Sequence, residues 1–262
     1  MIVQDNPTGT ERFVMTMDQH TAFASRLAEE FGNDKFASIE NEPLRYVIAN
    51  HDAGWKQVDP DVHINPASGF PYHLSETPFE YASLTMRGSP DFNAKHGALS
   101  GLLSSMHTTG LLNGRYGLAP PGIMARLEGD KKPFAESVLA GELARQNKLK
   151  TVISVDETFV WNAYKHLQFF DMLSLYFHSR AEGSRGTERF PDVPTHNGDD
   201  VTVTISEGIH RTYALDPFPF KKSGVKISFF GRWVSPVAAT ENGRTAFEAA
   251  VIASQTTTLL AG

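Results

Sequence analysis

Residues 46–59, YVIANHDAGWKQVD, place two adjacent polar side chains, His51 and Asp52, directly after a run of apolar residues. The apolar residues before His51 recur at the spacing of one helical face, so the helix turns this histidine toward the interior. A buried carboxylate beside a buried imidazole costs several kcal/mol unless a partner compensates for the lost water. The stretch therefore predicts a helical core with a polar site, and the rest of the chain has to supply the partner.

The composition is typical of a soluble globular protein. The chain has 262 residues, of which 40% are hydrophobic, and this is enough for one substantial core. Its net charge of -6 and its scattered Lys and Arg residues give no basic surface, so neither nucleic acid nor an anionic membrane is an expected partner. No apolar run approaches the roughly 18 residues that span a membrane, and the first residues lack the pattern of a secretory signal. We therefore expect a cytoplasmic protein.

The chain contains no cysteine. Disulfides, thiolate nucleophiles and cysteine-bound zinc or iron–sulfur clusters are therefore excluded. A metal ion in this protein would have only nitrogen and oxygen ligands.

Helical patterns dominate the first two thirds of the sequence. Helices are expected at 18–32, 42–55, 79–87, 91–113, 128–148 and 156–179. A long segment without periodicity, 58–78, is expected to form a loop beside the site, and 181–200 reads as a linker.

Alternating apolar residues indicate strands in the last third of the chain. Val201, Val203 and Ile205 alternate with polar residues, and 225–229 repeats this pattern. The tail 242–262 predicts a short helix and a last strand. We expect these strands to pair with N-terminal strands and cover one end of the helical core. The predicted fold is mainly α, a helical bundle with a small antiparallel β-sheet, with a helical domain at 1–185 and a β-rich extension at 186–262.

Three further polar residues lie on apolar stripes of predicted helices. They are His20, His107 and Asp171, each on a different helix from His51. Neutral imidazoles and carboxylates that converge from separate helices are typical ligands of zinc, iron or manganese. A divalent transition metal, as one or two ions, would compensate for the burial of these groups.

The order of these residues along the chain resembles the HD superfamily, which is named for its adjacent His-Asp pair. The superfamily contains metal-dependent phosphohydrolases and some iron-dependent oxygenases. More narrowly, the segments NHDAGW, GFPY, SSMHTTGL and FFDMLSLYF are similar to a family of uncharacterised bacterial proteins related to that superfamily. This resemblance covers about residues 1–180.

The resemblance implies that His20, His51, Asp52 and Asp171 are the metal ligands. His107 would be an additional ligand or a substrate contact, and His73 is a weaker candidate for a second metal. Lys56 stands near the position where some HD phosphohydrolases keep a basic residue that faces phosphate. The implied catalytic residues are Asp52, His107 and Lys56.

Three hypotheses of function remain open at this point. The first is a hydrolase that acts on a small phosphate-containing molecule through a metal-activated water. The second is an oxygenase that uses one or two irons on a small organic substrate, and the third is a non-catalytic binding module of the same fold. The expected partner is a small-molecule substrate, and a homodimer is left open.

Overall fold

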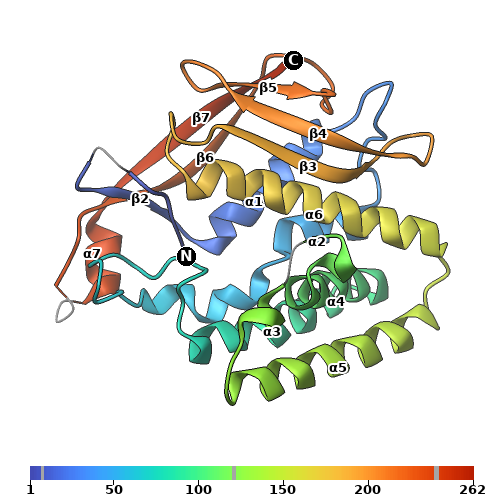
Figure 1. The fold of residues 1–262 in the computed structure, drawn as a ribbon, viewed down its shortest axis with the longest axis horizontal. Coiled ribbons are helices and arrows are strands. Elements are labelled where there is room, and N and C mark those ends of the chain that lie inside the picture. Colours follow the sequence, from blue (N-terminus) through green and yellow to red (C-terminus); the bar gives the residue numbers. More distant parts are fainter. Residues whose placement is uncertain (7–8, 120–121, 239–241) are drawn as a thin grey trace.

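The structure is a computed structural model, and it describes residues 1–6, 9–119, 122–238 and 242–262. A curled β-sheet covers one side of two long helices, α1 and α6, and the remaining large helices pack on the other side of this pair (Figure 1). The α-helices are α1 Met17–Glu30, α2 Glu42–Asn50, α3 Phe79–Ala94, α4 Ala98–Asn113, α5 Lys131–Lys150, α6 Glu157–Ser179 and α7 Gly243–Ala249. Short 3₁₀ turns are η1 Ala53–Gln57, η2 Asp59–Asp61, η3 Arg115–Gly117 and η4 Ile123–Arg126.

The sheet has seven strands among the described residues, in the order β1-β2-β6-β7-β5-β4-β3. Their bounds are β1 Ile2–Val3, β2 Arg12–Met15, β3 Thr187–Pro194, β4 Asp200–Glu207, β5 Thr212–Asp216, β6 Val225–Val234 and β7 Val251–Ala261. Neighbouring strands run antiparallel except β5 and β7, which are parallel. The N-terminal β2 pairs with β6, with Phe13 opposite Trp233, so both ends of the chain contribute to one sheet.

The expected fold class is therefore wrong. The protein is a mixed α/β structure with a large curled sheet, not a mainly helical bundle with a small antiparallel one. The largest miss is the segment 181–200, which contains the edge strand β3 instead of being only a linker. The predicted helix 91–113 is also wrong in its start, because α3 continues to Ala94 through Pro90 and α4 begins only at Ala98.

The core lies between α1, α6 and the inner face of the sheet. Phe23 of α1 contacts Phe177 of α6 with ring centroids 5.7 Å apart, and it contacts Phe229 of β6 at 5.1 Å. All three side chains are fully buried. Such aromatic contacts bury much apolar surface and fix the relative positions of the elements. They hold α1 and α6 rigidly beside each other, which matters because both helices carry site residues.

Local sequence signals fix the helices that approach the site. Thr16 caps α1 in a capping box with Gln19, and Asn41 accepts a hydrogen bond from Leu44 N at the start of α2. At the end of α4, Gly114 adopts the left-handed conformation (φ 71°) that favours glycine. No helix of the described residues is long and apolar enough to cross a lipid bilayer.

Candidate metal centre

His20 is the fourth residue of α1, and its side chain points into the centre. Its side chain is fully buried, and the apolar residues on the same stripe, Phe23 and Leu27, pack into the core. The cap at Thr16 fixes where α1 begins and therefore which residues face inward. The histidine is thus held on a rigid helix rather than on a loop.

His51 and Asp52 stand at the junction between α2 and η1. His51 still has helical dihedral angles (φ -59°, ψ -30°), whereas Asp52 leaves the helix (φ -103°, ψ 22°). His51 Nδ1 donates a hydrogen bond to Ile48 O at 2.9 Å, so in the neutral ring the lone pair lies on Nε2. This junction turns two adjacent side chains toward the same point.

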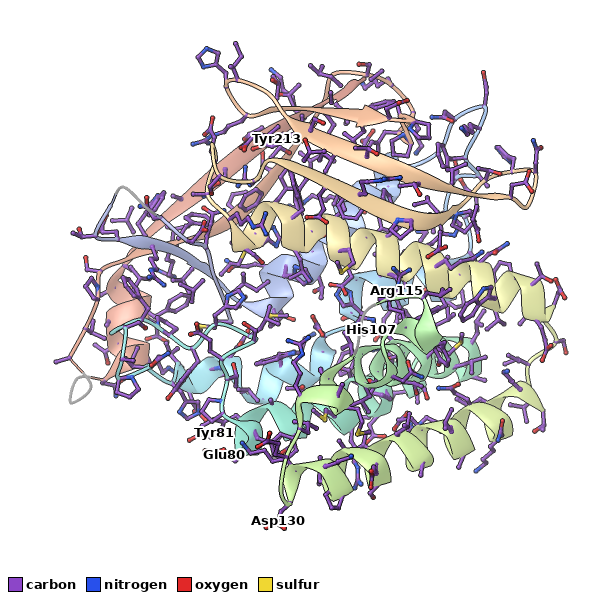
Figure 2. All side chains as sticks on the ribbon, in the orientation of Figure 1. Glu80, Tyr81, His107, Arg115, Asp130 and Tyr213 are labelled. Atoms are coloured by element: carbon purple, nitrogen blue, oxygen red, sulfur yellow. The ribbon has the colours of Figure 1, made fainter. Side chains whose placement is uncertain are left out.

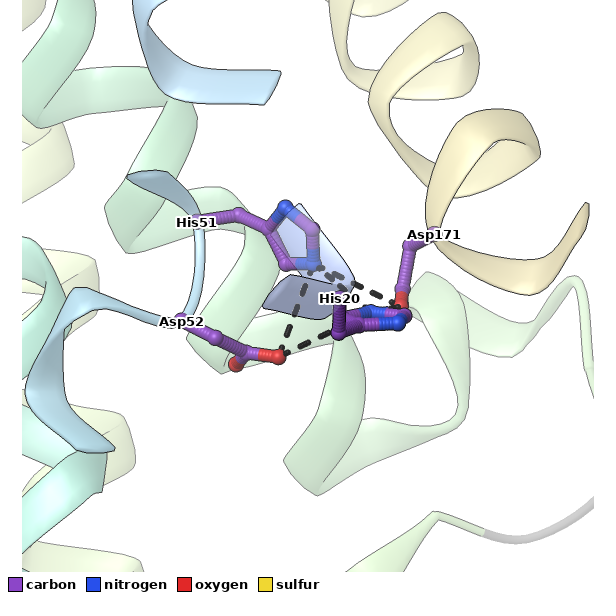
Figure 3. Close-up of side chains that lie close together, drawn as sticks. All are labelled: His20, His51, Asp52 and Asp171. Atoms are coloured by element: carbon purple, nitrogen blue, oxygen red, sulfur yellow. Dashed lines mark hydrogen bonds and ion pairs between the residues drawn. The ribbon is translucent and has the colours of Figure 1, made fainter. Parts of the chain in front are cut away.

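Asp171 completes the group from the middle of α6. Its carboxylate is 7% exposed, and its Oδ1 lies 3.2 Å from His20 Nε2 and 3.5 Å from His51 Nε2. Asp52 Oδ2 lies 3.5 Å from His51 Nε2 and 4.0 Å from His20 Nε2. Figure 3 shows that the two imidazoles and two carboxylates face one another across a small space. One ligand atom from each residue lies within 4.8 Å of all the others.

These separations fit a bound cation. Four ligands at about 2.1 Å from a central ion lie about 3.4 Å apart in a tetrahedron. The two Nε2 atoms of His20 and His51 are 3.4 Å apart, and the distances to the carboxylate oxygens range from 3.2 to 4.0 Å. The donor set and its spacing therefore show that His20, His51, Asp52 and Asp171 can hold a metal ion.

In the metal-free protein, a proton bound to His51 partly compensates the negative charge of the carboxylates. Burial would lower the pKa of His51, but the carboxylates of Asp52 and Asp171 outweigh it and raise this pKa to about 9. Burial would raise the pKa of Asp171, but hydrogen bonds from His20 and His51 hold it well below its usual value. The site therefore attracts positive charge even when no metal ion is bound.

His107 lies next to this group but outside it. It projects between α4 and α6 (Figure 2), with its ring centroid 5.2 Å from that of His51. Gln168 of α6 donates a hydrogen bond to His107 Nδ1 at 2.8 Å. A neutral His107 in this pair carries its proton on Nε2, which makes that atom a donor and not a metal ligand. Burial lowers the pKa of His107 and favours this neutral form.

The remaining predicted site residues lie outside the group of ligand atoms. Lys56 is partly exposed, with Nζ 3.5 Å from Asp18 Oδ1 and 4.7 Å above the ring of Phe92. His73 Nδ1 accepts a hydrogen bond from Val3 N at 3.1 Å. Among the described residues, His20, His51, Asp52 and Asp171 form the one group of three or more ligand atoms close enough to share an ion, and His73 is not part of it.

The sequence analysis did not assign His178 to the site, although it lies beside the centre. It is fully buried at the end of α6, and its Nδ1 lies 3.0 Å from Nδ1 of His20. Burial, followed by the effect of His20, holds the pKa of His178 well below its usual value. A signal was present, because residue 178 is seven positions after Asp171 and therefore on the same face of α6.

In a comparison with known protein families, residues 1–236 match the family described as "Protein of unknown function (DUF3891)". The chain belongs to this family. The expected likeness to an uncharacterised family is thereby confirmed, whereas the wider resemblance to the HD superfamily has no support from the match. Comparisons with curated proteins and with solved structures give no match.

Proposed function

We propose that this member of the DUF3891 family is a metal-dependent hydrolase of the HD type that acts on a small phosphate-containing molecule. The observation that carries the proposal is the buried group of two imidazole nitrogens and two carboxylate oxygens within 4.8 Å of one another. A divalent ion such as Mn²⁺, Zn²⁺ or Fe²⁺ would polarise a phosphoryl oxygen and lower the pKa of a bound water. One ion fits the single group of ligand atoms among the described residues.

Asp52 is placed to handle the proton of the attacking water. Its side chain is 14% exposed, more than those of His20, His51 and Asp171, so substrate and water would approach from its side. One oxygen, Oδ2, faces the other ligand atoms, which leaves Oδ1 free to orient or deprotonate a water.

His107 and Lys56 are placed to bind negative charge on the substrate. The Nε2–H of a neutral His107 is a hydrogen-bond donor beside the metal group, since Gln168 occupies Nδ1. Lys56 carries a charge at the surface four residues after Asp52. There it would attract an anionic substrate, and its contact with Asp18 would be replaced by a contact with that substrate. These two roles rest on the resemblance and on position, because the chain shows no phosphate loop.

An isosteric substitution tests the proposal. Asp171→Asn keeps the shape of the side chain but removes the buried charge, so the variant is expected to lose bound metal, as measured by elemental analysis. The rate at which the variant hydrolyses a model phosphodiester, such as bis(p-nitrophenyl) phosphate with added Mn²⁺, should fall together with its metal content. Asp34→Asn, at an exposed aspartate, is the matched control and should behave as the unmodified protein. Full metal content in Asp171→Asn would overturn the proposal.

His107→Asn separates the role of His107 from metal binding, because the asparagine carbonyl can accept the hydrogen bond from Gln168 in place of Nδ1 but the side chain has no donor in place of Nε2. The variant should keep its metal content, because His107 lies outside the ligand group, and its kcat should fall by a factor of about 10² to 10³. Loss of metal in this variant would instead show that His107 is a ligand.

An iron oxygenase is the second candidate. Two histidines and one carboxylate form the ligand set of many non-haem iron oxygenases, and His20, His51 and Asp171 contain that set with Asp52 in addition. Iron that copurifies with the protein, together with oxygen consumption in the presence of a reductant, would favour the oxygenase. A colourless protein whose phosphodiesterase activity depends on Mn²⁺ would favour the hydrolase.

A further inference from the structure

The contact between His20 and His178 differs from the usual support of a metal-binding histidine. Such a histidine normally donates its second ring N–H to a carboxylate or a backbone carbonyl, as His51 does to Ile48 O. Within the described part of the chain, His20 has neither partner: its Nδ1 faces Nδ1 of a second imidazole at 3.0 Å, and both side chains are fully buried. Two facing ring nitrogens at this distance share one proton, because two protons would clash and two lone pairs would repel.

The position of that proton decides whether His20 can bind a metal. If the proton is on His178 Nδ1, neutral His20 carries its own proton on Nε2, which points at Asp171 Oδ1 3.2 Å away and blocks the ligand position. If the proton is on His20 Nδ1, the Nε2 lone pair is free to face the other ligand atoms. The state that binds a metal therefore requires His178 Nδ1 to accept a hydrogen bond.

We propose that His178 is a positioning residue that holds His20 in the tautomer whose Nε2 is free to bind the metal ion. This inference rests on the metal centre that the proposed function assumes. The neutral ring of His178 accepts a hydrogen bond at Nδ1 and carries its proton on Nε2. Because His20 and His178 belong to α1 and α6, the contact also fixes the distance between the two helices at the level of the site.

The surroundings of the second nitrogen argue that this histidine is not present for packing alone. His178 Nε2 is buried and has no hydrogen-bond partner among the described residues. The ring instead contacts Phe23 and Phe229, with centroid distances of 4.9 and 4.7 Å. A phenylalanine would fill this aromatic space without an unpaired polar atom of its own. Packing alone therefore does not account for a histidine at this position, and the contact with His20 is what the imidazole provides.

Two substitutions at the same position separate this role from packing. His178→Phe keeps a ring of similar size and removes the acceptor, whereas His178→Asn keeps an acceptor, because Asn Oδ1 can occupy the place of His Nδ1. Zn²⁺ affinity, measured by competition with a chromophoric chelator at pH 7.5, should fall about 10- to 100-fold in His178→Phe. His178→Asn should recover most of that affinity. The free energy of unfolding of the metal-free protein should change little in His178→Phe, because the variant loses the unpaired Nε2 of His178 and leaves Nδ1 of His20 unpaired instead.

Nitrogen NMR of ¹⁵N-histidine-labelled protein gives a direct readout. With Zn²⁺ bound, the signals of His20 should show a protonated Nδ1 and those of His178 a protonated Nε2. Unchanged Zn²⁺ affinity in His178→Phe, or a protonated Nδ1 on His178 in the zinc-bound protein, would overturn the inference and leave the metal centre intact. An unmodified protein that binds neither Zn²⁺ nor Mn²⁺ would overturn the metal centre itself, and the inference with it.

Discussion

At the scale of single residues, the centre consists of four polar side chains. Burying any one of them alone would destabilise the fold, whereas the four together stabilise one another. The Nε2 atom of each imidazole lies within 4.0 Å of an oxygen of both carboxylates, so the charges compensate one another inside the core. The sequence was sufficient to find His20, His51, Asp52 and Asp171, because each follows apolar residues at helical spacing. Whether they bind metal remains a prediction.

His51 makes the stability of the metal-free protein depend on pH. Its pKa is about 9 in the folded chain and about 6.5 in the unfolded chain, so the folded state binds the proton more tightly. The resulting stability is fully present below pH 6.5 and is lost as the pH rises through 9, at a total of about 3 kcal/mol. Urea unfolding in the presence of a chelator at pH 6 and pH 9 measures this loss.

The same experiment on His51→Asn provides the control, since this variant has no imidazole to titrate between the carboxylates. It should show a smaller change in stability between the two pH values. An equal loss in both proteins would mean that groups other than His51 cause the pH dependence.

At the scale of secondary structure elements, helix positions were predictable where one face is apolar, and strand positions were not always. The edge strand β3 has the sequence TERFPDVP, in which two prolines remove backbone donors and charged residues interrupt the alternation. Such a strand is defined by its pairing with β4, which only the fold supplies. His178 was missed for a related reason: it lies at the end of α6, where a helix is usually exposed, but here β6 covers it through Phe229.

The close contact between η1 and α3 fixes the position of η1, which directly follows the candidate ligand Asp52. A Cβ atom on Gly54 would lie 2.6 Å from Thr85 O and 2.8 Å from Ser89 N, and neither backbone atom can move without the helix. Gly54→Ala should therefore push η1 away from α3, lower the free energy of unfolding by about 1–3 kcal/mol and weaken metal binding through Asp52. Chemical denaturation and Zn²⁺ competition measure the two effects.

Gly141→Ala in α5 is the matched control for this substitution. Nothing lies within 4 Å of the added Cβ, and alanine favours a helix more than glycine does, so this variant should be more stable by about 0.5–1 kcal/mol. Unchanged stability and metal affinity in Gly54→Ala would contradict the importance of the contact between η1 and α3.

At the scale of the whole molecule, the metal centre and the sheet share one core. The four candidate ligands come from α1, from the end of α2 with the following η1, and from α6, while α1 also packs against β6 and α6 against β3. Strand β6 pairs with both the N-terminal β2 and the C-terminal β7, so the sheet joins segments on both sides of residue 185 (Figure 1). The predicted division into 1–185 and 186–262 followed the change from helical to alternating apolar spacing, and the pairing of the late strands with N-terminal ones was part of the same expectation.

This arrangement predicts that a metal ion stabilises the sheet as well as the helices. A ligand that binds only the folded state raises the free energy of unfolding by about 2.7 kcal/mol when its concentration is 100 times its dissociation constant. If the chain unfolds as one unit, backbone amides of β6 and β7 should gain the same protection from hydrogen exchange as those of α1 and α6 when Zn²⁺ is added. The Asp171→Asn variant, which lacks a ligand, should show no gain in either region. Protection confined to the helices would instead mean that residues 186–262 unfold independently of the metal-binding part.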